Sequence, residues 1–263
     1  MLPSSGESER PPSRTRPSLG RVAAFLVVLL ILPNVIGTGW LQEVARGSRP
    51  LTQAFFFPVE ILGVLLPALA FSSGFDRRTV LRWRPARPSW ILVAALASLG
   101  WGGVLTYLQT FWQHATGLAP PTGLDWLLSA HSARGWTLLI LGAALLPALC
   151  EETAFRGLVL SGYGRWGGLV GGGVTTLLFA AYHMTPYGLP TYLVLGTLLA
   201  WLAWRTGSVL PGIAAHATNN LLALVQVSLL PEAWWSQHAA IVAPVAVILA
   251  IGSTWWLHRA MRD

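Results

Sequence analysis

Long apolar stretches, separated by short polar ones, run through almost the whole chain. A helix that crosses the roughly 30 Å hydrocarbon core of a bilayer needs about 20 mostly apolar residues. Stretches of that kind recur about eight times, and we expect each to be a transmembrane helix. They cover residues 21–41, 54–72, 90–110, 135–160, 167–184, 190–204, 208–230 and 239–257. The pattern predicts an all-α fold, a polytopic transmembrane bundle of about eight helices.

The first twenty residues differ from the rest of the chain because they are rich in Ser, Pro and Arg. Such a composition buries too little apolar surface to offset the entropy of ordering, so we expect residues 1–20 to be a disordered N-terminal arm. The apolar stretches given above run through the remainder. Residues 21–263 are therefore predicted to form a single transmembrane helical domain.

The composition supports a membrane location. Hydrophobic residues make up 54% of the chain and charged residues only 10%, whereas an average soluble domain is about 25% charged. The 14 tryptophans are also typical of membrane proteins, because indole rings settle at membrane–water boundaries. The net charge of +7 comes from arginines scattered between the apolar stretches. Because they form no single basic face, we expect a lipid bilayer as partner and no nucleic acid.

The arginines predict the orientation of the bundle. Eight alternating helices with a cytoplasmic N-terminus leave 14 of the 17 basic residues on the cytoplasmic side, as the positive-inside rule expects. These are Arg10, Arg14, Arg16, Arg21, Arg77, Arg78, Arg82, Arg84, Arg87, Arg156, Arg165, Arg205, Arg259 and Arg262. The other side receives Arg46, Arg49 and Arg134. Both termini are therefore predicted to be cytoplasmic, in an integral protein of the cell (plasma) membrane.

Ionisable side chains inside the bilayer core cost about 2.5–3.5 kcal/mol or more, so each is a functional candidate. They gather mainly between residues 149 and 220, with Glu60 as the main exception. The cluster comprises Glu151, Glu152, Arg156, His183 and His216, with Asn219 and Asn220 beside the last of them. We infer a functional site built from several neighbouring helices.

Helical spacing suggests how this cluster is organised. Glu152 and Arg156 are separated by four residues with the acid first, the favourable order for an ion pair along one helix. Glu151 points about 100° away from Glu152, so it is expected to face a cavity and act as a general base. From the predicted helix ends, Glu151, His183 and His216 lie roughly 12–22 Å deep at 1.5 Å per residue. We therefore predict one site, reached from the cytoplasm.

At these residues the sequence resembles the CPBP family of intramembrane proteases, also called the CaaX protease and bacteriocin-processing (Abi-like) family. Its membrane-embedded core carries three motifs in order: E-E-x-x-x-R, F-x-x-x-H and H-x-x-x-N. In this chain they read Glu151-Glu152-Thr-Ala-Phe-Arg156, Phe179-Ala-Ala-Tyr-His183 and His216-Ala-Thr-Asn-Asn220. The resemblance covers residues 135–230, which would be the catalytic core.

The resemblance implies a bundle of about eight helices around a buried cavity, and hydrolysis of a peptide bond in a membrane-bound protein or peptide. Prenylated CaaX-type chain ends are among the family's substrates. Glu151 and His183 would activate water, and His216 and Asn220 would stabilise the oxyanion. The resemblance implies that Glu152, Arg156 and Phe179 have structural, supporting roles.

Several alternatives remain open. Glu151, His183 and His216 could form a three-ligand zinc site with an open position for water, although the common H-E-x-x-H pair is missing. The family also contains bacteriocin-immunity proteins, so a non-catalytic immunity or scaffold protein is one rival. A proton-coupled transporter is another, but it predicts a repeat and discontinuous helices. The sequence contains no G-x-S-x-G or G-x-G-D motif, which argues against serine and aspartyl intramembrane proteases.

Overall fold

The computed structural model describes residues 16–44, 53–120, 128–230 and 232–262, and within these ranges helices are the only regular secondary structure. Most of the predicted N-terminal arm lies outside the described residues, and the first helix, α1, begins at Leu19. The all-helical fold class predicted from the sequence is confirmed.

The described helices follow the predicted apolar stretches closely. They are α1 (Leu19–Val44), α3 (Phe56–Pro58), a π-helical segment (Val59–Leu65), α4 (Leu66–Phe71), α5 (Arg77–Val80), α6 (Pro88–Thr116), α8 (Ala133–Leu139), a second π-helical segment (Ile140–Leu145), α9 (Leu146–Glu151), a third (Glu152–Val159), α10 (Leu160–Tyr163), a 3-10 turn (Gly164–Trp166), α11 (Gly168–Tyr182), α12 (Leu189–Thr206), α13 (Leu210–Leu229), α14 (Glu232–Gln237) and α15 (Ala239–Ala260). Segments that adjoin in this order run on as one helix over Phe56–Phe71 and over Ala133–Trp166.

Among the described residues, four helices are long and apolar enough to cross a bilayer. They are Leu19–Gly37, Pro88–Thr116, Ala133–Trp166 and Ala239–Ala260. The helices Phe56–Phe71 and Gly168–Tyr182 are apolar but shorter. Length and composition thus fit a helical membrane bundle, and the number of crossings stays a prediction.

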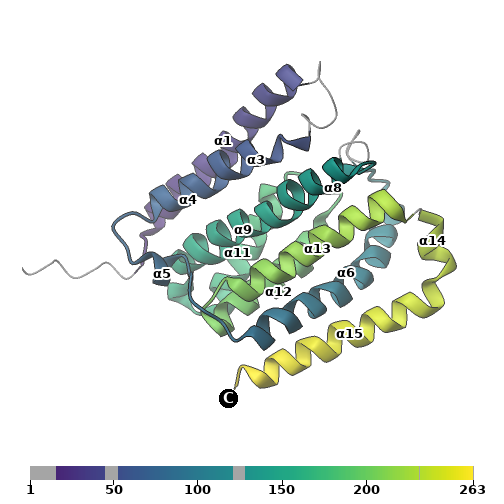
Figure 1. Ribbon diagram of the computed structural model, residues 1–263. Helices are drawn as coiled ribbons and strands as arrows, with labels where there is room; N and C mark the ends of the chain where they lie inside the picture. The colour runs from purple at the N-terminus through teal and green to yellow at the C-terminus, as the bar shows by residue number, and fades with distance from the viewer. Residues whose placement is uncertain (1–15, 45–52, 121–127, 231, 263) are drawn as a thin grey trace, which may run out of the picture.

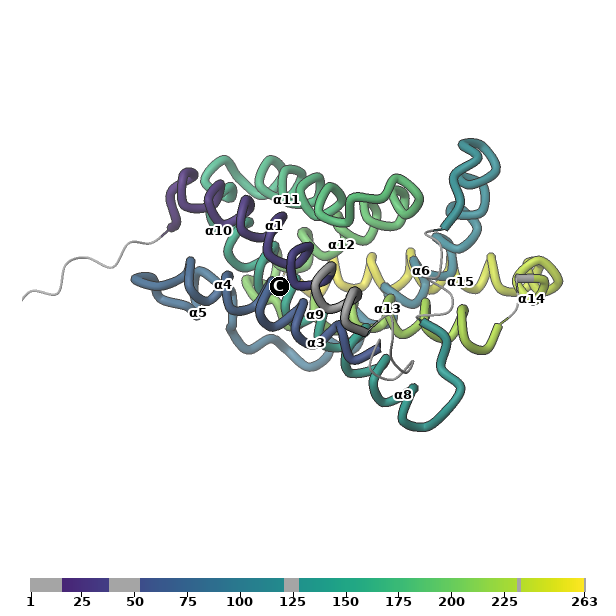
Figure 2. The backbone as a smooth tube through the Cα atoms, turned by 90° about the horizontal axis from the view of Figure 1, so that it is seen from above, coloured from purple at the N-terminus to yellow at the C-terminus, as the bar shows by residue number. Residues whose placement is uncertain are grey.

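The long helix Ala133–Trp166 lies in the middle of the bundle (Figure 1). On one side of it are α1 and the Phe56–Phe71 helix, and on the other side α13, α6 and α15 follow in turn. Figure 2 shows α11 and α12 as a pair that lies behind these helices in the first view. The central helix therefore has neighbours on several sides, which is where a buried polar site can form.

Prolines mark two departures from regular α-helical geometry. The sequence Leu-Leu-Pro-Ala-Leu occurs at residues 65–69 and again at 145–149. In both places a π-helical segment ends just before the Leu-Pro pair. Proline has no N–H and its ring clashes with the carbonyl four residues earlier, and a widened π turn relieves that conflict. The third π-helical segment, Glu152–Val159, carries motif residues, as such bulges often do.

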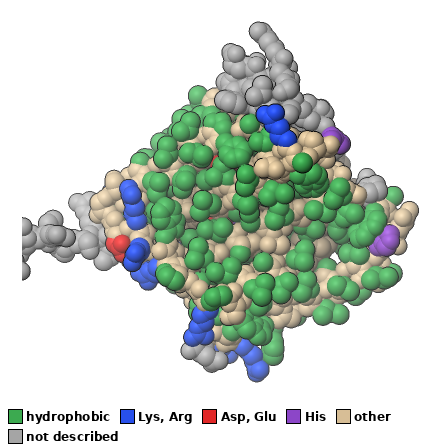
Figure 3. Space-filling model, viewed as in Figure 1, with side chains coloured by type: hydrophobic (Ala, Val, Ile, Leu, Met, Phe, Trp, Pro, Cys, Tyr) green, Lys and Arg blue, Asp and Glu red, His purple; other side chains and the backbone are tan. Residues whose placement is uncertain are grey.

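One end of the bundle collects most of the described arginines. Contacts between their side chains and distant backbone hold that end together: Arg21 donates to Ser73 O at 2.9 Å, Arg82 to Ala203 O at 3.1 Å, and Arg205 to Met261 O at 3.0 Å. In Figure 3 most blue side chains accordingly lie at the left and lower edges, one more lies near the top, and hydrophobic side chains cover much of the face between them. We name this the arginine end.

The predicted arginine distribution needs one correction. Arg156, assigned above to the cytoplasmic side, is completely buried within the bundle. It lies ten residues before the end of its helix at Trp166, or about 15 Å at 1.5 Å per residue. Its charge is held by buried partners and therefore says nothing about orientation. Four further arginines, Arg10, Arg14, Arg46 and Arg49, lie outside the described residues.

Candidate active site

The predicted ion pair is present in the central helix. Glu152 and Arg156 are both fully buried, and Arg156 Nη1 donates to Glu152 Oε1 at 2.9 Å. The second arm of the guanidinium, Nη2, donates to Gly196 O on α12 at 3.1 Å. Its Cζ atom also lies 4.2 Å from the centroid of the Phe179 ring on α11. Arg156 therefore ties three helices together through one buried charge.

Glu152 has a second partner, on α13. His216 Nδ1 lies 3.1 Å from the same oxygen, Glu152 Oε1, and because a carboxylate only accepts, the imidazole nitrogen donates. A carboxylate that binds one ring nitrogen sets the tautomer and the orientation of the ring. The pair of Glu152 and Arg156 therefore does more than support the helix, because it directs His216 Nε2 away from Glu152.

His216 Nε2 faces the predicted general base. It lies 3.8 Å from Glu151 Oε2, and both side chains are nearly buried. That separation is too long for a hydrogen bond, and it leaves room for both atoms to contact one small polar group or water. Glu151 Oε2 has no hydrogen-bond partner among the described atoms. A buried carboxylate oxygen with no partner is costly, which points to a site that receives a ligand.

His183 lies at the end of α11, where it is the C-cap residue. Its Nδ1 is 2.9 Å from Phe179 O, and since a carbonyl oxygen only accepts, Nδ1 carries the proton. In the neutral ring the lone pair is then on Nε2. The ring stacks on Tyr192 of α12 with a centroid separation of 4.0 Å. His183 thus has a fixed ring plane and a free basic nitrogen.

Phe179 joins the two histidines. Its ring centroid lies 4.8 Å from that of His183 and 5.7 Å from that of His216, edge to face in both pairs. Together with the Arg156 contact, this makes Phe179 the residue around which the three motifs meet. No hydrogen bond or ion pair joins Glu151 to His183 among the described residues, so the water-activating pair implied by the family resemblance is not directly bonded.

Asn220 lies on α13 one helical turn after His216, and it is half-buried. No hydrogen bond joins it to another motif residue in the described part of the chain. The structure therefore places Asn220 on the side of α13 that carries His216 without giving it a partner.

The motif analysis missed three contributors. Glu60, in the first π-helical segment, is 6% exposed, has an unpartnered Oε2 and interacts electrostatically with Glu151. Its only signal in the sequence is an acid within an otherwise apolar stretch. Gly196 and Tyr192, described above, carry no signal of their own, because their roles depend on the way α12 packs.

Close helix approach is built into the site. A Cβ atom on Gly212 of α13 would lie 2.9 Å from Glu152 Oε2, and one on Gly196 would lie 3.0 Å from Thr176 Cγ2. A larger residue at Gly212 would crowd the Glu152 carboxylate of the central helix, and one at Gly196 would push α12 away from α11. Both glycines thus allow the short contacts that Glu152 and Arg156 make.

A zinc ion would need Glu151, His183 and His216 together. Within the described residues, no three His, Cys, Asp or Glu side chains gather as a metal-binding group. The donor types suit zinc, but the spacing brings only Glu151 and His216 face to face. A metal shared by these three residues therefore stays a prediction, and the chemistry below follows from the side chains themselves.

Buried glutamates and a buried histidine at the centre of an apolar helical bundle define a polytopic membrane protein with a polar site in its interior. The family model described as Type II CAAX prenyl endopeptidase Rce1-like matches residues 133–222, which run from α8 to the middle of α13. This match supports assigning that segment to the CPBP family of CaaX-type intramembrane proteases. Comparisons with curated proteins and with solved structures find no match.

Proposed function

We propose that this protein is an endopeptidase that hydrolyses a peptide bond of a membrane-associated protein or peptide, with Glu151 as the general base. The observation that carries the proposal is the 3.8 Å separation between Glu151 Oε2 and His216 Nε2 inside the bundle. The tetrahedral intermediate of hydrolysis has its attacking oxygen and its oxyanion on one carbon. A base and an oxyanion donor must therefore lie only a few ångströms apart, as these two atoms do.

The proposed reaction begins with a water molecule bound at Glu151. Its carboxylate takes a proton from the water, and the hydroxide attacks the scissile carbonyl carbon. His216 donates from Nε2 to the resulting oxyanion while Nδ1 donates to Glu152, so it acts as an imidazolium supported by that carboxylate. Asn220 supplies a second donor; one such donor contributes about 3–4 kcal/mol in other proteases. Glu151 then returns the proton to the leaving amine as the C–N bond breaks.

His183 is proposed to orient the water. Its Nδ1 is occupied by Phe179 O, which leaves Nε2 as an acceptor for one O–H of the water. A second acceptor would direct the remaining lone pair of the water toward the carbonyl carbon. This role requires His183 and Glu151 to contact the same water, since no hydrogen bond joins the two side chains directly in the described part of the chain.

The substrate class and location are proposed from the family and the arginine end. Prenylated CaaX-type chain ends suit a bundle whose walls are apolar. The arginine end would face the cytoplasm under the positive-inside rule, with the site opening toward it in the plasma membrane. We propose the glutamate-based mechanism rather than a metalloprotease, because only two of the three predicted zinc ligands face each other.

The test compares peptide termini by mass spectrometry in a host that lacks this protein. The host is complemented with wild type, with Glu151→Gln, or with Cys150→Ala as a matched control. Cys150 is the buried neighbour of Glu151 and has no part in the proposed reaction. We expect new termini with wild type and Cys150→Ala and none with Glu151→Gln.

Equal termini in all strains, together with rescue of the deletion phenotype by Glu151→Gln, would overturn the protease proposal and favour an immunity or scaffold protein. Loss of the termini with Cys150→Ala would move the nucleophile to the thiol. Purified wild type treated with a chelator and analysed for zinc decides between the two protease types, since the glutamate-based mechanism predicts full activity after metal removal.

A further inference from the structure

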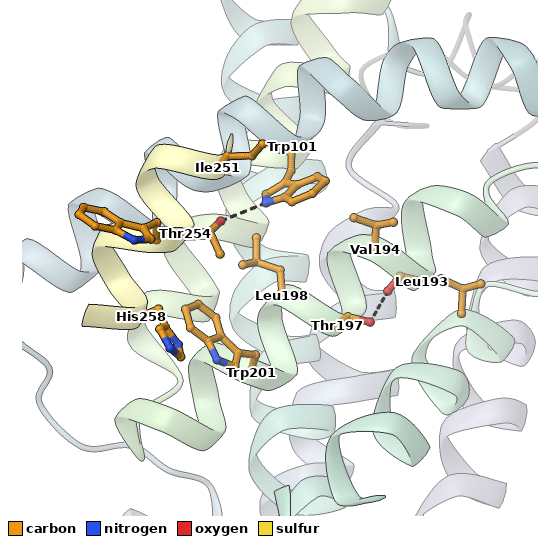
Figure 4. Close-up of a pocket in the computed structure, with 10 residues that line it drawn as sticks. Trp101, Leu193, Val194, Thr197, Leu198, Trp201, Ile251, Thr254 and His258 are labelled. Atoms are coloured by element: carbon orange, nitrogen blue, oxygen red, sulfur yellow. Dashed lines mark hydrogen bonds between the residues drawn. The ribbon is translucent and has the colours of Figure 1, made fainter. Parts of the chain in front are cut away.

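A large groove lies between α12 and α15, with α6 as its floor (Figure 4). It encloses about 810 Å³, within the range of about 300–1,000 Å³ that is usual for ligand pockets. Both α12 and α15 pack against α6, but between Trp101 and the arginine end they stand apart. The groove is separate from the candidate active site, which lies on the opposite face of α12.

The groove is almost entirely apolar, and the polar groups of Trp101, Thr197 and Thr254 in its wall are already bonded. Trp101 Nε1 donates to Thr254 Oγ1 at 3.1 Å, and Thr197 Oγ1 donates back to Leu193 O in its own helix at 2.8 Å. Leu198 and Ile251 contribute hydrocarbon from the two facing helices. A cavity of this kind offers water few partners, so its natural occupant is a hydrocarbon chain.

The length of the groove matches one leaflet of a bilayer. On α12 it runs from Leu193 to Trp201, eight residues or about 12 Å at 1.5 Å per residue. One leaflet contributes about half of the roughly 30 Å hydrocarbon core. Figure 4 shows Trp101 at one end of the groove and Trp201 with His258 at the other. Trp201 and His258 stack with a centroid separation of 6.5 Å, so this second end reaches the arginine end.

Positive charge lies at the outer edge of that end. The Arg259 guanidinium covers the ring of Trp255, a residue of the groove wall, at 4.6 Å from its centroid. Arg205 is anchored nearby, on Met261 O. Neither α12 nor α15 contains an acidic residue. An anionic group bound here would therefore meet cations without facing a carboxylate from either helix.

We propose that this groove binds one anionic glycerophospholipid, with an acyl chain between α12 and α15 and the phosphate beside Arg259. The argument rests on shape and charge together: an apolar groove one leaflet long ends at an exposed guanidinium. Arginines near an anionic lipid surface contribute binding energy individually. The site is independent of the proposed protease activity, because it uses none of the motif residues.

Binding is measured by native mass spectrometry on the purified full-length protein in detergent. The probes are phosphatidylglycerol and phosphatidylcholine with identical acyl chains. The groove is filled by Ile251→Trp, and the matched control is Ile248→Trp, an exposed position of α15 outside the groove. The charge is removed by Arg259→Gln, with exposed Arg77→Gln as the control elsewhere at the arginine end.

We expect wild type to retain one phosphatidylglycerol in preference to phosphatidylcholine. Arg259→Gln should weaken the binding of phosphatidylglycerol about fivefold, the factor for one arginine at a lipid surface. Ile251→Trp should abolish retention of the lipid, and both control variants should bind it as wild type does. Equal retention of the two lipids, unchanged binding by Ile251→Trp, or a dimer that Ile251→Trp dissociates would each overturn the proposal. The last result would assign the groove to a second copy of the chain. Arg259→Gln leaves the groove intact, so it decides the charge argument even if Ile251→Trp fails to fold.

Discussion

Replacing Glu152 with Gln should destabilise the bundle, although the two side chains have nearly the same shape. Glu152 Oε1 accepts from Arg156 Nη1 at 2.9 Å and from His216 Nδ1 at 3.1 Å. The amide oxygen of Gln can still accept from Arg156, but it carries no charge, so the Arg156 guanidinium would stay fully buried without a counter-charge. An unbalanced buried charge is strongly destabilising.

The size of the effect follows from that defect. Removal of one member of a buried ion pair costs about 3–5 kcal/mol. For a chain of this size, each kcal/mol lowers the melting temperature by roughly 2–4 °C. We therefore expect Glu152→Gln to melt about 6–20 °C below wild type. The double variant Glu152→Gln/Arg156→Met removes both charges and should recover most of this loss, because two apolar or neutral groups need no counter-charge.

The assay is thermal unfolding of the purified protein in detergent, followed by intrinsic tryptophan fluorescence. Wild type, Glu152→Gln, Arg156→Met and the double variant form a complete cycle, whose coupling energy isolates the pair. A melting temperature for Glu152→Gln within about 2 °C of wild type would refute the buried-charge argument. A double variant less stable than either single one would show that the pair is not the source of the effect.

Three further predictions concern packing, orientation and pH. Gly100→Ala should lower the melting temperature, because its Cβ would overlap the α15 backbone and such overpacking destabilises a fold by about 1–3 kcal/mol. Gly173→Ala is the control, because Gly173 has open space around it and its melting temperature should not fall. Tyr192→Leu should reduce the rate of peptide-bond cleavage up to about tenfold by releasing the stacked His183 ring, whereas Tyr192→Phe should cleave at the wild-type rate. Equal rates for the Leu and Phe variants would show that stacking on residue 192 does not orient His183. The Thr79 hydroxyl, which hydrogen-bonds Asp76, lowers the pKa of this N-cap carboxyl of α5. Its stabilisation is therefore complete above the ordinary aspartate pKa of about 3.9 and is lost as pH falls through the lower folded value. Melting temperatures of wild type and Asp76→Ala should accordingly differ at pH 7 and converge in acid.

Within single helices, the sequence predicted a good deal of the site. The spacing of four residues placed Glu152 beside Arg156, and it placed Phe179 beside His183, where both a ring contact and a hydrogen bond occur. These relations depend only on the pitch of a helix, which every helix shares. The motif resemblance in turn selected the segment that the family model matches.

Relations between helices were harder to predict. The sequence did not indicate that His216 would donate to Glu152, 64 residues earlier, or that Glu60 would lie near Glu151. Such contacts depend on how far each helix is rotated about its axis and on how closely it approaches its neighbours. Small residues such as Gly212 decide that approach, and their effect is visible only when the partner is in place.

The sequence by itself determined that the chain forms apolar helices and where they begin and end to within six residues, and it predicted which residues carry chemistry. It could do so because lipid offers backbone groups no partners, so that a long apolar stretch must satisfy them internally as a helix. Only the tertiary structure decided that Arg156 is an interior charge rather than a marker of the cytoplasmic side. The same holds for the separation of α12 from α15. Both depend on side-chain packing across helices, which has no fixed period along the chain.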